Sequence, residues 1–373
     1  MKILYLFRSL AVYGGIERVL IEKMNILSSI AGMEVYMITT DQGDKLIPYC
    51  VNDNVHLEDL HILFYKQYLY NVIKRLWVLK KMVSQYEFML SKRLDEIKPD
   101  VIVCTTADRI QSIIKIKGNI PLVVESHSIC LRTFEYSNYW LVRKIYRRYL
   151  LNCLARADVV VALTERDAIE WRKFHRYVKV IPNIVNVYKG ILEPYSSKHV
   201  IFVGRFDYQK QVKEAILIWS KVHNEHPDWL LDVYGEGEQE DEIKLLANRV
   251  GGVIIHPPTN AIFDCYLNSS ILISTSLFEP FGLVIPEAMS CGLPVVAYDC
   301  PYGPASIIRD GLNGYLIDQG NTDDFSKKIC FLIEHPHTRI KMGCSAKLTS
   351  SNYCSSNIIP KWLSLFNMLD KKT

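Results

Sequence analysis

The 373-residue chain contains no apolar run that approaches the roughly 20 residues needed to span a membrane. Its ten cysteines include no C-x-x-C pair, which argues against a zinc site and against a disulfide framework. Scattered, unpaired cysteines are typical of proteins in a reducing cytoplasm. Internal repeats and low-complexity tracts are also absent. The sequence therefore predicts a globular cytoplasmic protein, and its length fits two domains.

The dinucleotide fingerprint G-x-G-x-x-G is missing as well. An apolar run, 2–7, is followed by Gly14-Gly15 and then by a helical period that starts at Ile16. Strand, glycine turn and helix together form a phosphate-binding arrangement, because N–H groups at a helix N-terminus point outward. A lone Gly-Gly does not indicate a dinucleotide, so we expect no cofactor.

Similar apolar runs recur and alternate with helical patterns. The runs that indicate strands are 2–7, 34–40, 99–104, 121–125, 157–162, 199–203, 230–234, 271–275 and 295–298. This alternation predicts an α/β architecture with parallel sheets. His127 follows one of these strands, at the carboxyl end where ligands bind in open α/β sheets. A purely structural role for this histidine is the alternative.

Charge is distributed unevenly along the chain. Residues 1–190 carry 28 Lys and Arg against 19 Asp and Glu, a net charge of +9, whereas residues 191–373 carry 16 against 21, a net charge of −5. A basic first half suggests an anionic lipid or a phosphate-bearing acceptor on that side. Chance clustering of surface lysines is the alternative.

The stretch 276–302 combines a loop, a helix start and a buried strand. Glu279 and Glu287 lie eight positions apart and are separated by Pro280-Phe281-Gly282, which breaks any continuous helix. A proline is tolerated in the first turn of a helix, so Pro286 predicts a helix that begins near 281–283. Gly292 and Pro294 then end it.

Such a helix N-terminus is an anion site, here formed by the N–H groups of Phe281, Gly282 and Leu283. Glu279 and Glu287 would flank a phosphate there and could accept hydrogen bonds from sugar hydroxyls. The ligand this implies carries both phosphate and hydroxyl-rich rings, which describes a nucleotide sugar. A surface loop with two solvated glutamates is the alternative.

This stretch resembles the E-x7-E segment of the retaining glycosyltransferases of glycosyltransferase family 4, commonly E-G-F-G-L-x-x-x-E-A-M-A. The departures are Pro280 and Ser290. The resemblance implies the GT-B fold, in which two Rossmann-like domains with parallel sheets face each other across a cleft. We expect an acceptor-binding domain at 1–185, a nucleotide-sugar-binding domain at 186–350, and a C-terminal helix at 351–373 that packs back on the first domain.

Further positions match the family's motifs. Arg205 and Lys210 match G-R-x-x-x-x-K, and a strand end that carries an arginine fork and a lysine point charge suits a diphosphate. The resemblance places His127 near the transferred sugar. Gly303 to Ile308 resembles G-P-S-E-I-I, but Ser306 replaces the usual acid. The expected catalytic residues are His127, Arg205, Lys210 and Glu279. The expected donor-binding residues are Gly14, Gly15, Arg205, Lys210, Glu279, Phe281, Gly282, Leu283 and Glu287.

The expected function is transfer of a hexose or N-acetylhexosamine, with retention, from a nucleotide-diphosphate sugar to a glycan or lipid-linked oligosaccharide of a bacterial-type surface polysaccharide. UDP is favoured over GDP. No D-x-D pair is present to hold a divalent ion, so we expect no metal and no nucleic-acid partner. The alternatives are a retaining glycosidase that uses the two glutamates, and a catalytically silent sugar-nucleotide binding protein.

Two basic, aromatic stretches, 65–93 and 139–150, have the composition of helices that lie in a membrane interface. They predict peripheral contact with an anionic membrane at the inner face of the cell. Helices that face the core and expose a basic side are the alternative.

Overall fold

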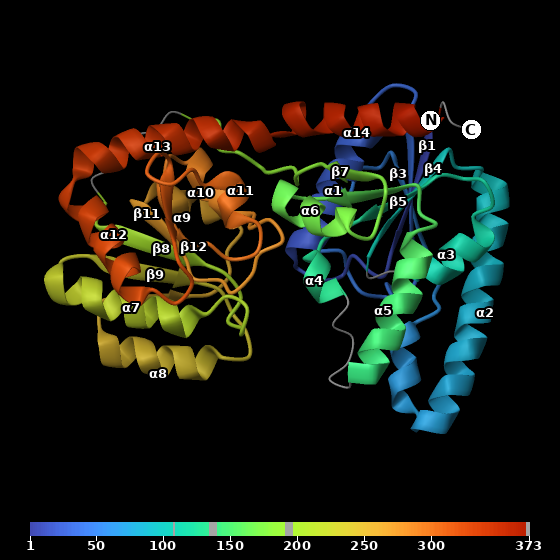
Figure 1. Cartoon of the computed structure of the whole chain (residues 1–373), viewed down its shortest axis with the longest axis horizontal. Helices are drawn as coiled ribbons and strands as arrows, with labels where there is room; N and C mark the ends of the chain where they lie inside the picture. The colour runs from blue at the N-terminus through green and yellow to red at the C-terminus, as the bar shows by residue number, and fades with distance from the viewer. Residues whose placement is uncertain (107–108, 134–139, 191–196, 371–373) are drawn as a thin grey trace. The chain divides into compact units, whose positions relative to one another are not determined.

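The computed structural model describes every residue except 107–108, 134–139, 191–196 and 371–373. The chain forms two compact units (Figure 1). Unit 1 comprises residues 1–184 and 358–373, and unit 2 comprises residues 185–357. The boundaries drawn from the sequence were 185/186 and 350/351, so the second unit extends seven residues further along the chain than expected.

Unit 1 is built on a seven-stranded parallel sheet with the order β3-β2-β1-β4-β5-β6-β7. Its strands are β1 Lys2–Phe7, β2 Glu34–Thr39, β3 Val55–Asp59, β4 Val101–Thr105, β5 Leu122–Glu125, β6 Val159–Ala162 and β7 Val178–Val180. The first six strands follow the Rossmann order 3-2-1-4-5-6. Strands β4, β5 and β6 are buried throughout, as parallel strands covered on both faces must be.

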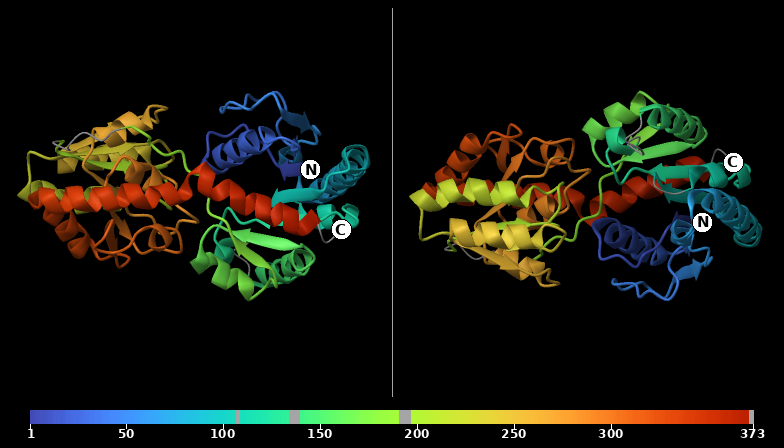
Figure 2. Two further views of the ribbon diagram at one scale, coloured as in Figure 1. Left: turned by 90° about the horizontal axis from the view of Figure 1, so that it is seen from above. Right: turned by 90° about the horizontal axis from the view of Figure 1, so that it is seen from below.

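Helices cover both faces of this sheet. They are α1 Gly15–Ser28, η1 Phe64–Leu69, α2 Val72–Ile97, α3 Ile110–Ile116, α4 Cys130–Thr133, α5 Trp140–Leu154, α6 Glu165–Arg172 and α14 Ser355–Asp370. One hydrophobic cluster joins the sheet to α2, α3, α5 and α6, and a second joins its other face to α1 and α14. The C-terminal helix therefore packs on unit 1, although the chain reaches it from unit 2 (Figure 2).

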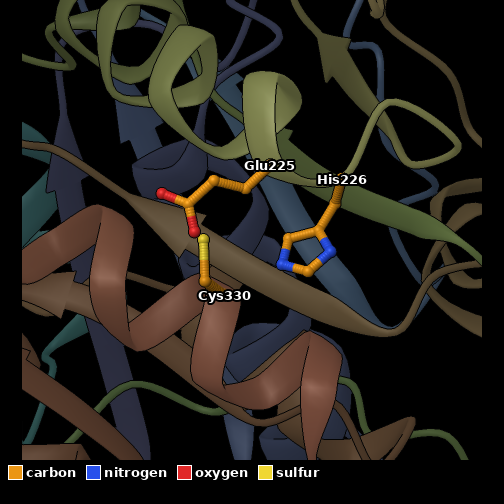
Figure 3. A group of neighbouring side chains, drawn as sticks. All are labelled: Glu225, His226 and Cys330. Atoms are coloured by element: carbon orange, nitrogen blue, oxygen red, sulfur yellow. The ribbon is translucent and has the colours of Figure 1, made fainter.

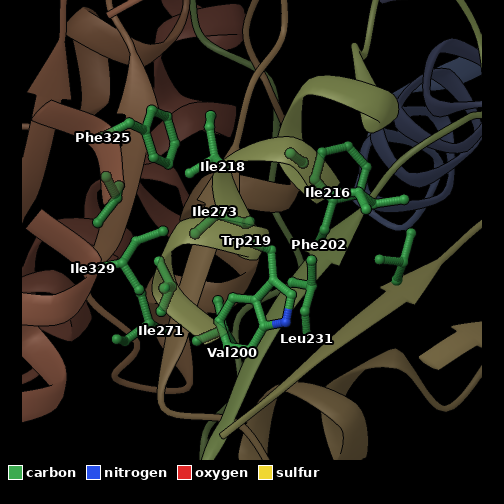
Figure 4. Packing of buried hydrophobic residues seen from close by; sticks show 14 of the residues in the cluster. Val200, Phe202, Ile216, Ile218, Trp219, Leu231, Ile271, Ile273, Phe325 and Ile329 are labelled. Atoms are coloured by element: carbon green, nitrogen blue, oxygen red, sulfur yellow. The ribbon is translucent and has the colours of Figure 1, made fainter. Parts of the chain in front are cut away.

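Unit 2 repeats the Rossmann order with six parallel strands, β10-β9-β8-β11-β12-β13. The strands are β8 His199–Val203, β9 Leu230–Tyr234, β10 Val253–His256, β11 Ile271–Ser274, β12 Val295–Tyr298 and β13 Gly314–Ile317. The helices are α7 Val212–Glu225, α8 Glu240–Val250, α9 Ile262–Leu267, α10 Val284–Ser290, α11 Pro304–Ile307, α12 Thr322–Glu334, α13 Pro336–Ser350 and η2 Ser351–Tyr353. Trp219 of α7 lies within the core that this sheet shares with α7, α8 and α12 (Figure 4).

The α/β prediction with parallel sheets is confirmed, and several elements match closely. Strands 2–7, 230–234 and 295–298 have the expected bounds, and Thr164 caps α6 by accepting a hydrogen bond from the N–H group of Asp167. The stretch 65–93 is not one helix, because η1 ends at Leu69 and α2 begins only at Val72. Asn71 accepts a hydrogen bond from the Lys74 N–H group and so starts the second helix.

Candidate active site

Three predicted side chains of unit 2 lie at the point where its strand order reverses. Arg205 and Lys210 follow β8, and Glu279 follows β11, the strand that pairs with β8. In open α/β sheets this carboxyl edge is where ligands bind. The sequence could place these residues on neighbouring loops only after β8 and β11 were known to be adjacent.

Lys210 and Glu279 form an ion pair, Nζ to Oε1, which the sequence did not predict. The Ser276 hydroxyl donates to the same carboxylate oxygen at 2.8 Å, and Glu279 is 4% exposed. The backbone of Glu279 is held as well, because its N–H group donates to Pro301 and its carbonyl accepts from Tyr302. Lys210 therefore has a fixed position before any ligand binds.

Arg205 differs from Lys210 in being mostly exposed. Its guanidinium lies 3.0 Å from a carboxylate oxygen of Asp207 and donates to the Gln209 side chain at 3.3 Å. Exposed pairs of this kind contribute little to stability, so this arginine can exchange its partners for a phosphate at small cost. The loop thus presents one fixed and one adaptable cation.

The turn after β9 packs directly on the loop that carries Arg205. A Cβ atom at Gly235 would lie 2.0 Å from the Gly204 carbonyl oxygen, and one at Gly237 would lie 2.5 Å from the Phe206 carbonyl oxygen. Only glycine permits this approach of two backbones. The turn at Gly235 and Gly237 therefore shapes the loop that bears the two cations.

The segment between the two glutamates turns at Gly282, which has φ +84°. Helix α10 begins at Val284 with Leu283 as its N-cap residue, at the end of the predicted window. Within the part of the chain that the structure describes, no acceptor lies against the N–H groups of Phe281, Gly282 and Leu283. These groups remain available to an anion.

Glu287 lies one turn inside α10 and is 2% exposed. Phe281, next to the turn, is buried and packs edge-on against Tyr353, with ring centroids 5.3 Å apart. Ser306, which stands where the family has an acid, donates to the Tyr302 carbonyl at 3.2 Å. The expected donor residues of unit 2 thus gather on the loops after β8 and β11 and on α10.

The predicted residues of unit 1 are Gly14 and Gly15 at the start of α1 and His127 after β5. Gly14 caps α1, which begins at Gly15, and a Cβ atom at Gly14 would lie 2.4 Å from Oε2 of Glu17. Burial raises the pKa of Glu17, whereas His127 and Arg8 lower it through their charge. The glycine turn and His127 therefore share an electrostatic environment through a glutamate that the sequence analysis did not single out.

His127 is 8% exposed, and its Nε2 lies 3.1 Å from Oε2 of Glu125. The other oxygen of Glu125 pairs with Lys23 of α1. Burial alone would raise the pKa of Glu125, but Lys23 and His127 hold it at about 2. Sequence reasoning missed both residues. The available signal was Lys23 itself, since Leu20, Met24 and Leu27 place it on the apolar stripe of α1.

One group of side chains in the described residues has donors suited to a metal. Glu225, His226 and Cys330 offer donor atoms within 4.8 Å of one another at the C-terminal end of α7 (Figure 3). Burial and neighbouring glutamates raise the pKa of the Cys330 thiol to about 12. Helix α7 has 14 residues, so this cluster lies roughly 20 Å along its axis from the loop of Lys210. A metal here would not contact a ligand bound at that loop.

Two family models match adjoining parts of the chain. Residues 13–189 match the model described as Glycosyltransferase Family 4, and residues 189–349 match that described as Glycosyl transferases group 1. The chain belongs to glycosyltransferase family 4. The enzyme is thus a glycosyltransferase, and its two parallel sheets are those of the GT-B fold.

This glycosyltransferase has relatives that match it over most of its length. An uncharacterised glycosyltransferase of Haemophilus influenzae is 27% identical and covers 97% of this chain and 98% of that protein. A lipopolysaccharide 1,6-galactosyltransferase of Salmonella typhimurium is 26% identical over 87% of this chain and 88% of that protein. TarM of Staphylococcus aureus, solved as a mutant with UDP and alpha-GlcNAc-glycerol, has a TM-score of 0.78, 18% identity and coverage of 98% and 99%.

Proposed function

We propose that this glycosyltransferase moves a hexose or N-acetylhexosamine, with retention, from a UDP-sugar to a glycan or lipid-linked acceptor of a bacterial surface polysaccharide. The observation that carries the proposal is the pair of cations after β8, of which Lys210 pairs with Glu279, two residues before the N–H groups of residues 281–283. The relatives support a role in surface polysaccharide synthesis and a UDP-sugar donor. The Salmonella relative is a lipopolysaccharide 1,6-galactosyltransferase, and TarM was solved with UDP.

In this proposal the protein's own side chains and N–H groups, rather than a metal ion, stabilise the leaving group. Departure of a nucleoside diphosphate develops negative charge, which Lys210 and the turn before α10 would neutralise from fixed positions and Arg205 after exchanging its present partners for the phosphate. Glu287 would accept hydrogen bonds from ribose hydroxyls, and Glu279 and His127 would hold the sugar. The chain contains no D-x-D pair, so we propose that no metal ion takes part.

The glycosidase alternative fits the site poorly. A glycosidase acid is normally placed in an apolar pocket that keeps it protonated, whereas Glu279 pairs with Lys210 and accepts from Ser276. A catalytically silent sugar-nucleotide binding protein would have the same site. Only a measurement of sugar transfer distinguishes it from an enzyme.

The deciding experiment screens UDP-, GDP- and ADP-sugars by thermal shift and then tests the best donor for turnover. A ligand that binds the folded state raises the melting temperature, so a UDP-sugar should give the largest shift. Glu287→Gln should reduce that shift. Equal shifts with all three nucleotides would contradict the UDP assignment, and binding without transfer to any polysaccharide acceptor would support the silent binding protein.

We also propose that the enzyme works at an anionic membrane surface on the cytoplasmic side. The ten cysteines are all free, which suits a reducing compartment. No helix among the described residues is long and apolar enough to cross a membrane. Contact would therefore be peripheral, through a surface of unit 1 that the structure exposes.

That surface is formed by η1 and the first half of α2, residues 64–81. Its large apolar side chains are 64–85% exposed: Tyr68, Leu69, Val72, Ile73, Leu76 and Trp77. No Asp or Glu occurs between Asp59 and Glu87, whereas five Lys and Arg do. The second half of α2 faces the core, since it buries Tyr86, Leu90 and Leu94, whereas the exposed apolar side chains of residues 68–77 support the membrane proposal.

Three of the five cations of this surface lie over aromatic rings. Lys74 Nζ lies 4.6 Å from the Tyr70 ring centroid, Arg75 Cζ 4.1 Å from that of Tyr68, and Lys81 Nζ 5.9 Å from that of Trp77. Exposed apolar groups and uncompensated positive charge together are complementary to an anionic lipid interface. In α5, Ile145 and Tyr149 are also exposed beside Lys144, Arg147 and Arg148.

A further inference from the structure

Unit 1 contains a buried ion pair for which the proposed chemistry gives no role. Lys23 is 1% exposed and Glu125 is 2% exposed, and their side chains contact each other through Nζ and Oε1. Removing two charges from water costs free energy that can exceed their mutual attraction. A buried ion pair is therefore weak evidence that the pair stabilises the fold. A buried pair beside a proposed site residue calls for a functional explanation.

The pair is enclosed on every side. Lys23 Nζ lies 4.0 Å from the ring centroid of Trp362 in α14 and 5.2 Å from that of Tyr5 in β1. Tryptophan is the best aromatic partner for a cation, so the ammonium is held by a carboxylate and two rings. The C-terminal helix thereby closes the pocket in which Lys23 lies.

Glu125 joins this pocket to His127. Its two oxygens have different partners, Lys23 on Oε1 and Nε2 of His127 on Oε2. An ionised carboxylate accepts only, so Nε2 must carry a proton, and in the neutral ring Nδ1 is then the acceptor. Among the described residues no hydrogen-bond partner lies at Nδ1, which leaves this nitrogen for a ligand.

Lys23 affects how strongly the charge of Glu125 favours the doubly protonated, positively charged form of the His127 ring. With Lys23 present, the carboxylate charge is shared between an ammonium and the imidazole. Without Lys23, His127 would be the nearest cation partner of a buried carboxylate and would favour its charged form. The other charged and titratable groups here, Glu17, Arg8 and Tyr5, are the same in both cases.

We infer that Lys23 is a positioning residue, which acts through Glu125 to keep the ring of His127 neutral, fixed and open at Nδ1 towards the substrate. This inference rests on the proposed role of His127 at the transferred sugar. It adds a requirement that the family motifs do not state, because α1 and α14 must both be packed for His127 to work.

The test compares Lys23→Met, the double variant Lys23→Met with Glu125→Gln, and Leu27→Ala. Leu27 is a fully buried residue of the same helix and cluster, so its truncation controls for destabilisation of α1. The activity of each is measured as kcat/KM against pH. In Lys23→Met the acid limb of this profile should move up by about one pH unit, because Glu125, the carboxylate beside His127, loses its ammonium partner.

The double variant should move the acid limb to lower pH, since it removes the Glu125 carboxylate that favours a charged His127 ring. It also leaves no unpaired buried charge, so it should fold even if Lys23→Met does not. Leu27→Ala should lower activity without moving the limb. Equal losses at every pH in all three variants would overturn the positioning role.

A second measurement does not depend on the proposed reaction. Nitrogen NMR of the labelled enzyme, with His127→Gln used for assignment, reports the tautomer and pKa of His127 without donor or acceptor. A proton on Nε2 in the wild type and a raised pKa in Lys23→Met are expected. An unchanged His127 titration in Lys23→Met would refute the inference even if the enzyme transfers sugar. The expected NMR result without any sugar transfer would instead refute the proposed function.

Discussion

At the scale of single residues, the two cations after β8 have different environments. Lys210 is largely buried and paired with Glu279, whereas Arg205 is mostly exposed. A preorganised charge costs no reorganisation when the leaving group departs, but an exposed arginine must be drawn into place. We therefore expect Lys210 to contribute mainly to the chemical step and Arg205 to contribute to donor binding as well.

Lys210→Ala should lower kcat by roughly 10²–10³-fold, the usual cost of removing one preorganised donor, and Arg205→Ala should lower kcat and weaken donor binding as well. Added magnesium should not restore either variant, and the wild-type enzyme should remain active in EDTA. Steady-state assays of UDP release provide the measurement. Lys213→Ala is the matched control, since Lys213 lies three residues further along and pairs with Glu242 at the surface.

Loss of wild-type activity in EDTA, with recovery on adding magnesium or manganese, would show that an ion performs this electrostatic role. Lys210→Ala also leaves Glu279 without its cation, so the stability of this variant must be measured beside its rate. Arg205→Ala has no such complication.

At the scale of elements, α2 is divided into two halves with different partners. Its second half buries Tyr86, Leu90 and Leu94 in the core of unit 1. Its first half extends beyond the sheet (Figure 1), and its residues Val72, Ile73, Leu76 and Trp77 are exposed. Large exposed apolar patches on a folded protein mark interaction sites. The absence of any acid between Asp59 and Glu87 makes an anionic lipid surface the partner that fits best.

Vesicle flotation at low salt should recover the wild-type enzyme with anionic vesicles and much less with neutral ones. Ile73→Ser with Trp77→Ser should abolish recovery, and Lys80→Gln with Lys81→Gln should weaken binding about fivefold per charge, since each cation contributes about 1 kcal/mol. Salt should weaken the wild-type interaction by screening.

Phe88→Ser is the control for this surface, because Phe88 is 74% exposed on the same helix but lies past Glu87. It should float as the wild type does. Equal recovery with neutral and anionic vesicles would contradict the lipid assignment. Loss of self-association in the Ile73 and Trp77 variant, without any change in flotation, would assign the surface to a second copy of the chain.

At the scale of the whole molecule, the chain returns to unit 1 after completing unit 2. Ile358, Trp362, Leu365, Phe366 and Leu369 of α14 are buried in the cluster that includes β1, β4 and α1. The last helix is thus part of the first unit's core, and that core is complete only when the C-terminal residues are present.

Phe366→Ala should therefore destabilise unit 1 by about 3–5 kcal/mol, the usual cost of truncating a buried phenylalanine. Hydrogen exchange read by mass spectrometry should show faster exchange in peptides from β1 and β4 and unchanged exchange in β8 and β11. Phe331→Ala, at a partly exposed position of α12, is the control. Faster exchange confined to unit 2 would contradict the assignment of α14 to the first core.

The sequence by itself determined most of the strands and the residue types of the proposed donor site. Parallel strands that are buried on both faces read as apolar runs, so β1, β9 and β12 were visible without tertiary information. Glu279 and Glu287 were predicted from their spacing around a helix start, and Arg205 and Lys210 from their place after a strand and their match to a family motif. Short or half-exposed strands such as β3 and β10 were not found, because their apolar patterns are weak.

Only the tertiary structure decided what these side chains contact. The pairing of Lys210 with Glu279, 69 residues apart, and of Lys23 with Glu125, 102 residues apart, follows from strand order and helix packing, which local periodicity does not encode. The tertiary structure also decided which part of α2 is buried. A helical apolar stripe indicates that one face is buried only if a partner lies against it, and in the first half of this helix Val72, Ile73, Leu76 and Trp77 stay exposed.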